Sequence, residues 1–285
     1  MALTTSSGSS RPTQWATLVF GTKNPDLAVP NLQFYDPDTK TNSYFIAEGN
    51  KRQNIDISGR LTSLKVIDVE GYNDRKNKTG EKNAKRMVAI IDDESDPHSM
   101  GLLVDLVSDT GVPNTNALSL FGALVKHFGT TYDMGDTEAS STEIPIQVGL
   151  YSAESKTKKG AFYPRAAVRL PASYEGTTPV FRGGNTIHAD EMAPQAPAKM
   201  VDGEPLKDNN GIIIRDYKPV MAWLEAQFAS LEAARAARST EQEGAAGEST
   251  SEAGAADAPA VEEDAGVAVD AVLEGQTTAT PRPRG

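Results

Sequence analysis

Two stretches decide how this chain is organised: Gly59-Arg-Leu-Thr-Ser-Leu-Lys-Val-Ile-Asp-Val-Glu-Gly-Tyr72 and Lys82-Asn-Ala-Lys-Arg-Met-Val-Ala-Ile-Ile-Asp-Asp93. Both contain runs of β-branched residues, which favour strands. The segment between them is longer than a tight hairpin turn requires, and such loops are often functional or disordered. Its basic residues are Arg75, Lys76, Lys78, Lys82, Lys85 and Arg86. We therefore predict two paired strands joined by a mobile basic loop that binds a partner.

The elements expected after this pair are a strand at 102–107, a helix, and strands at 144–150 and 161–170. The helix follows from apolar residues at helical spacing, with N-cap residues behind Pro113 and a stop at Gly129. The resulting order is strand, strand, strand, helix, strand, strand. This is the order of an OB-fold, whose oligonucleotide-binding face is flanked by the loops joining strands one to two and four to five.

The two loops at those positions are the most basic in the chain. Between residues 51 and 86, ten bases oppose five acids. Between 156 and 182, six bases oppose one acid, so each region carries a formal charge of +5. The second region includes the lysines Lys156, Lys158 and Lys159. Two basic loops flanking one face predict a binding surface for a polyanion, although surface charge runs are usually only solvated.

The strand at 161–170 carries the most informative side chains. Because side chains alternate along a strand, Tyr163, Arg165 and Arg169 share one face. An aromatic ring and guanidinium groups on one face can stack a base and hold phosphates, which single-stranded nucleic acid requires. Tyr72 and Tyr151, at the bases of the two basic loops, are further stacking candidates; the alternative is that they close the end of a barrel.

The ends of the chain differ from its middle. Residues 1–12 are rich in Ser and Thr, and residues 239–285 contain no aromatic residue, so both are predicted to be disordered. The total formal charge is −11, of which the ten acids and two arginines of 239–285 account for −8. The β-rich domain is expected at 13–238, with a further hairpin near 32–47 and a C-terminal helix capped by Asp216.

Several classes of protein are not indicated. The chain has no cysteine, which excludes disulfides and Cys-ligated metals, and no apolar run or leader that predicts a membrane span or secretion. Its three histidines lie far apart, and no phosphate-binding glycine loop or nucleophile motif occurs. We therefore expect no enzyme activity, cofactor or metal site, and an intracellular location.

Five segments resemble phage single-stranded-DNA-binding proteins: Gly59-Arg-Leu-x-Ser-Leu, Met87-Val-Ala-Ile-Ile-Asp-Asp93, Leu102-Leu-Val-Asp-Leu, Asn116-Ala-Leu-Ser-Leu-Phe121 and Ile146-Gln-Val-Gly-Leu-Tyr151. Within them the chain is most similar to the Drc family, the single-stranded-DNA-binding cofactors of RNA polymerases encoded by tailed phages. The resemblance covers roughly residues 59–233. It implies location in the host cytoplasm, binding to melted middle promoters, recruitment of a phage RNA polymerase, and a fold that departs from the standard OB barrel before Gly59 and after Asp216.

The sequence thus predicts an α+β, antiparallel β-rich domain with OB-like strand order, one central helix, a C-terminal helix and a disordered acidic tail. It predicts sequence-tolerant binding of single-stranded DNA and leaves a homo-oligomer open. A replication or recombination protein would use the same DNA chemistry. A virion structural or adaptor protein without DNA binding is the alternative of a different class.

Overall fold

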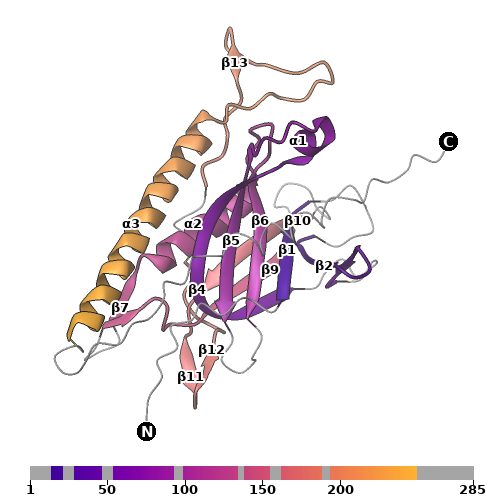
Figure 1. The fold of residues 1–285 in the computed structure, drawn as a ribbon. Helices are drawn as coiled ribbons and strands as arrows, with labels where there is room; N and C mark the ends of the chain where they lie inside the picture. The colour runs from indigo at the N-terminus through magenta and orange to yellow at the C-terminus, as the bar shows by residue number, and fades with distance from the viewer. Residues whose placement is uncertain are drawn as a thin grey trace.

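Eight strands form one curled mixed sheet in the order β10-β9-β4-β5-β6-β1-β2-β3 (Figure 1). The computed structural model describes residues 14–21, 29–46, 54–92, 99–133, 138–154, 162–187 and 193–248. The strands of this sheet are β1 (Gln14–Val19), β2 (Asn31–Asp36), β3 (Thr41–Tyr44), β4 (Ile55–Val69), β5 (Ala84–Asp92), β6 (Met100–Val107), β9 (Ile146–Glu154) and β10 (Phe162–Arg169). The β-rich α+β class is confirmed. The predicted antiparallel pairing holds throughout this sheet except at β1, which pairs in parallel with β6 and makes the sheet mixed.

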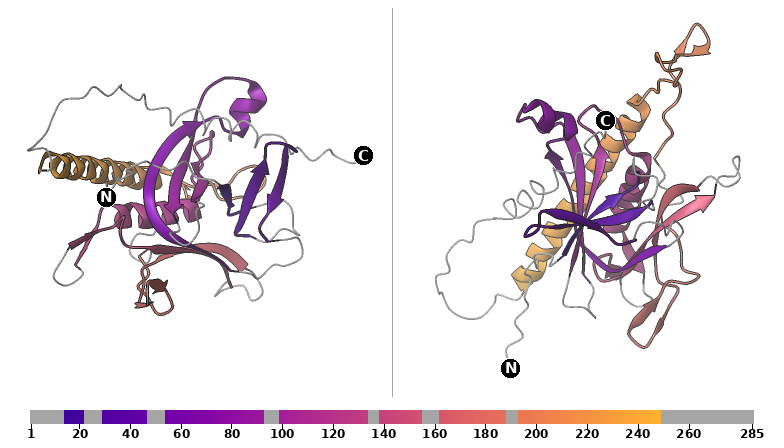
Figure 2. Two further views of the ribbon diagram at one scale, coloured as in Figure 1. Left: turned by 60° about the horizontal axis from the view of Figure 1, so that its bottom comes forward. Right: turned by 90° about the vertical axis from the view of Figure 1, so that its right-hand side faces the viewer.

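The long strand β4 produces the curl. It pairs with β9 through Ile55–Gly59 and with β5 through Arg60–Val69, so it belongs to both halves of the sheet. Gly59 stands at the change of partner with φ of 155°, and a Cβ there would lie 2.5 Å from the carbonyl oxygen of Asp92. Only glycine tolerates this conformation and approach. The bend turns the sheet into a half-barrel. The left view of Figure 2 shows the long β4 ribbon curving from one half of the sheet to the other.

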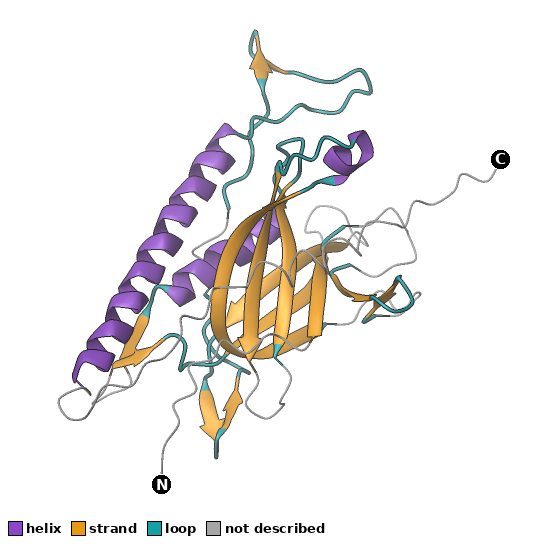
Figure 3. Cartoon of the chain, viewed as in Figure 1, coloured by secondary structure: helices purple, strands orange, loops and turns teal. Residues whose placement is uncertain are grey.

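Two helices pack on the buried face of the half-barrel (Figure 3). The predicted helix is α2 (Thr115–Phe128), and the Asn114 side chain caps it by accepting from the backbone N of Ala117 at 3.3 Å. Across it lies α3 (Lys218–Glu248), whose Phe228 ring meets Phe121 edge-on at 5.8 Å between centroids. Phe121 belongs to the buried core, and the partly buried Phe228 packs against it.

The C-terminal helix is longer than the sequence indicated. Asp216 does accept a hydrogen bond from the backbone N of Lys218, as expected for a cap. The helix then continues to Glu248, so residues 239–248 of the predicted disordered tail are helical. The remaining tail and the predicted disordered segment 1–12 lie outside the described residues.

Several short elements have no counterpart among the predicted ones. They are α1 (Tyr72–Asn77), the pair β7 (Thr131–Asp133) and β8 (Glu138–Ser140), the hairpin β11 (Ser173–Glu175) and β12 (Thr178–Val180), and the hairpin β13 (Met200–Val201) and β14 (Glu204–Pro205). Each is too short to show a period of two or of 3.6 residues. The hairpin near 32–47 is confirmed as β2 and β3.

His127 predicts how stability responds to acid. Its buried ring contacts the Tyr132 hydroxyl at 2.8 Å through Nδ1, and burial lowers the pKa of His127 from 6.5 to about 4. Between these values the unfolded chain binds the proton that the fold rejects, so stability is full above pH 6.5 and falls toward pH 4. The expected loss between pH 7 and pH 4.5 is about 2.4 kcal/mol. Urea midpoints at pH 7 and 4.5 measure it, and His127→Gln should flatten the dependence. An equal slope in both proteins would contradict this account.

Candidate nucleic-acid interface

The hairpin β9–β10 brings together side chains that the sequence could only place separately. In its register Arg165 lies opposite Tyr151, Ala167 opposite Gly149, and Arg169 opposite Gln147. Directly opposed residues of an antiparallel pair project to the same side of the sheet. Tyr151, Tyr163, Arg165 and Arg169 therefore share one face, which we refer to as the β9–β10 face. The opposite face of β10 places Ala166 and Val168 in the core.

Exposure varies along this face. The Tyr163 side chain is 43% exposed, Arg165 is also exposed, and Tyr151 and Arg169 are partly buried. Arg169 donates to Gln147 Oε1 at 3.1 Å and lies 3.9 Å from Asp56 Oδ1. Its charge is therefore partly balanced. Tyr163 and Arg165 are the members best placed to meet a ligand.

The predicted mobile loop between β4 and β5 is instead held in place, and two aspartates explain why. Asp109, from the segment after β6, accepts hydrogen bonds from the backbone N atoms of Asn73 and Asp74 at the start of α1. The buried Asp74 carboxylate accepts from the Asn83 side chain at 2.9 Å and from the backbone N of Gly71 at 3.1 Å. These hydrogen bonds lower the pKa of Asp74, and the bond from the Asn83 side chain has the largest effect.

The basic residues of this segment divide into two groups. Lys76, Lys78 and Lys82 are exposed, and the Tyr72 ring at the start of α1 is 65% exposed. Arg75 is partly buried and donates to the carbonyl oxygen of Glu70.

Two of the predicted binding residues have structural partners instead. Arg86 is only 7% exposed and pairs with Asp105 at 2.6 Å, so its charge is already balanced within the sheet. Lys85 pairs with Asp68 at 3.0 Å and lies over the Phe228 ring of α3. The cause is register, since Arg86 opposes Asp105 and Lys85 opposes Asp68 across the strands. Lys156, Lys158 and Lys159 lie outside the described residues.

One short segment connects α1 with the β9–β10 face. Asp109, which caps α1, and Asn116, whose Oδ1 accepts from Arg165 Nη1 at 3.3 Å, stand at its two ends. Seven residue steps span at most about 25 Å, which bounds the separation of these anchor points. Gly111, with φ of 75°, turns the chain between them and shortens this distance further.

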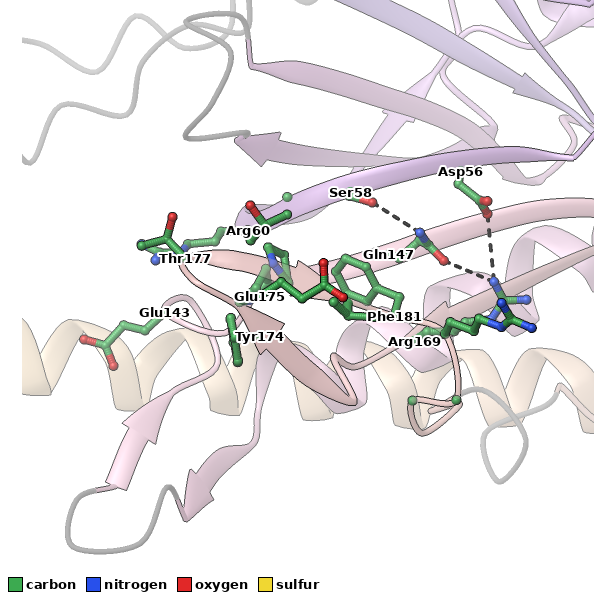
Figure 4. Close-up of a pocket in the computed structure, with 18 of the residues that line it drawn as sticks. Asp56, Ser58, Arg60, Glu143, Gln147, Arg169, Tyr174, Glu175, Thr177 and Phe181 are labelled. Atoms are coloured by element: carbon green, nitrogen blue, oxygen red, sulfur yellow. Dashed lines mark hydrogen bonds and ion pairs between the residues drawn. The ribbon is translucent and has the colours of Figure 1, made fainter.

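A pocket opens at the other end of the β9–β10 face, with a volume of about 1090 Å³ (Figure 4). Its lining comes from β4, β9 and β10, from the end of β5, from the segment before β9, and from the β11–β12 hairpin with residues 181–184. Arg169 belongs both to this pocket and to the β9–β10 face.

Most of the residues that organise these surfaces are not evident from the sequence. Gln147 was detectable, because it alternates with Gly149 and Tyr151 on a predicted strand. Asp109 and Asn116 carried no such pattern. Their roles depend on which segments meet in the fold.

No protein-family model matches the chain, and no curated protein or solved structure matches it either. Among the described residues, no helix is long and apolar enough to span a membrane.

Proposed function

We propose that this protein binds single-stranded DNA along the β9–β10 face and α1. The carrying observation is that Tyr151, Tyr163 and Arg165 share one face, and that Arg165 contacts the segment that clamps α1. On the α1 side the exposed Tyr72, Lys76 and Lys78 supply a ring and two cations. Rings stack on any base and cations follow the phosphates, so binding by these groups is tolerant of sequence.

The strand connections support an OB-like arrangement. The chain order β4, β5, β6, α2, β9, β10 has the helix between the third and fourth strands, and β4 pairs with both β5 and β9. The segment with α1, which forms one side of the proposed surface, joins β4 to β5, one of the two loop positions that an OB-fold uses for binding. The sheet departs from a closed barrel because β6 pairs with β1 where it would otherwise meet β10.

A role in phage transcription, through recruitment of a phage RNA polymerase to melted promoters, rests on the family resemblance alone and stays a prediction. A replication or recombination protein would need the same surface. A virion structural or adaptor protein would not, and its DNA affinity would be absent.

Filter binding of the full chain to single- and double-stranded oligonucleotides tests the proposal. We expect tighter binding to the single strand and an affinity that falls with salt. Three phosphate contacts, by Lys76, Lys78 and Arg165, predict a slope of log K against log salt of about −2. Equal affinity for both forms, or no binding at low salt, would overturn the proposal.

A further inference from the structure

The pocket beside the β9–β10 face has a floor of hydrogen-bonding groups from three adjacent strands. Arg169 of β10 donates to Gln147 of β9, and Gln147 Nε2 donates to Ser58 Oγ of β4 at 3.4 Å. Asp56, also on β4, lies 3.9 Å from Arg169, which is longer than a hydrogen bond. Figure 4 shows these four side chains together at one end of the pocket.

Gly149 keeps this group accessible. A Cβ at that position would lie 3.1 Å from Asp56 Oδ1 and 3.4 Å from Arg169 Nη1. The Gln147 amide oxygen accepts from Arg169 and its amide nitrogen donates to Ser58. These bonds hold the Arg169 side chain in its orientation at the pocket floor. The carboxylate of Asp56 and the further N–H groups of the Arg169 guanidinium face a ligand, next to the second N–H of the Gln147 amide.

The charge of the lining argues against phosphate as the group that enters. Three arginines, Arg60, Arg169 and Arg182, stand against four carboxylates, Asp56, Asp92, Glu143 and Glu175. A phosphate would meet a lining with a formal charge of −1. A flat, uncharged group with donors and acceptors at its edge suits the floor better, and the aromatic residues Tyr174 and Phe181 also line the pocket.

We propose that this pocket takes one unstacked guanine base of the bound strand, an inference that rests on the proposed function. Guanine presents two adjacent donors, N1–H and N2–H, which match the two oxygens of Asp56, and its O6 accepts from Arg169. Adenine and cytosine offer that carboxylate only one amino donor. Thymine has a single N–H between two carbonyl oxygens, and these oxygens would repel the carboxylate. The protein is therefore tolerant of sequence along most of the strand and selective at one position.

Oligothymidylates about twelve nucleotides long, unchanged or with one central dG, dC or dA, provide the test. We expect the full-length protein to bind the dG strand about five- to tenfold more tightly than the unsubstituted strand. Asp56→Asn should remove this preference, because the amide presents a donor to one of the two guanine donors. Glu143→Gln is the matched control: it removes the same charge from the same pocket lining and should keep the preference.

The outcomes separate the two proposals. Binding to every strand with equal affinity would overturn the guanine pocket and leave single-strand binding standing. A dG preference that survives Asp56→Asn, or that Glu143→Gln also abolishes, would overturn the assignment to Asp56. Failure to bind any of the strands would overturn the proposed function itself.

Discussion

Replacing Tyr163 and Arg165 together with alanine is expected to weaken binding to a single-stranded oligonucleotide on the order of 100-fold at low salt. Loss of one stacking ring removes about 1–3 kcal/mol. Loss of the guanidinium removes a phosphate contact, so the salt dependence of binding should also become shallower by about 0.7. Both side chains are exposed at the outer half of the β9–β10 face, so the fold should tolerate their loss. Fluorescence anisotropy across a salt series measures both effects.

A second double variant controls for the loss of one exposed tyrosine and one exposed arginine at a different place on the surface. Tyr44 is 39% exposed on β3, close to the exposure of Tyr163, and Arg235 is exposed on α3. Changing both to alanine removes the same groups from surfaces to which we assign no DNA contact. We expect its affinity and salt slope to match those of the unaltered protein. If the two double variants bind alike, the β9–β10 face is not the binding surface.

Replacing Phe121 with alanine should cost about 4 kcal/mol of unfolding free energy. The Phe121 ring of α2 is fully buried and packs edge-on against Phe228 of α3. The substitution therefore removes apolar contacts between the two helices and leaves a cavity there. The helix α3 should also become easier to detach from the half-barrel. A urea titration of the full chain measures the loss, and amide exchange along α3 locates it.

Phe45→Ala is the control for this substitution. That ring is 60% exposed beside β3 and lies outside the core, so its removal should change stability by less than about 0.5 kcal/mol. A similar loss of stability in both variants would mean that the cost at Phe121 does not come from its buried packing between α2 and α3.

The regular elements of this protein were predictable because each has a local cause. The β-branched runs around Leu64 and Val88 predict β4 and β5, and the spacing from Ala117 to Phe128, with Asn114 before it and Gly129 after it, predicts α2. Alternation along the strand places Tyr163, Arg165 and Arg169 on one side of β10 whatever strand pairs with it. Those features depend on neighbours along the chain, which a sequence displays.

The candidate site depended on contacts between distant residues. Lys78 and Arg86 belong to the same basic stretch of sequence. Lys78 remains exposed, whereas Arg86 of β5 forms an ion pair with Asp105 of the neighbouring strand β6. The expected mobile loop became α1 because Asp109 caps it from another segment.

By itself, the sequence determined the longer strands of the sheet, the central helix, the start of the C-terminal helix and the alternating face of β10, since these follow from periods, caps and breakers in consecutive residues. Only the tertiary structure decided which cations stay available, which loop is held, and that Tyr151 lies beside Arg165. The physical reason is that hydrogen bonds and ion pairs depend on distance in space, and the bend of β4 at Gly59 brings both halves of the sheet into one half-barrel.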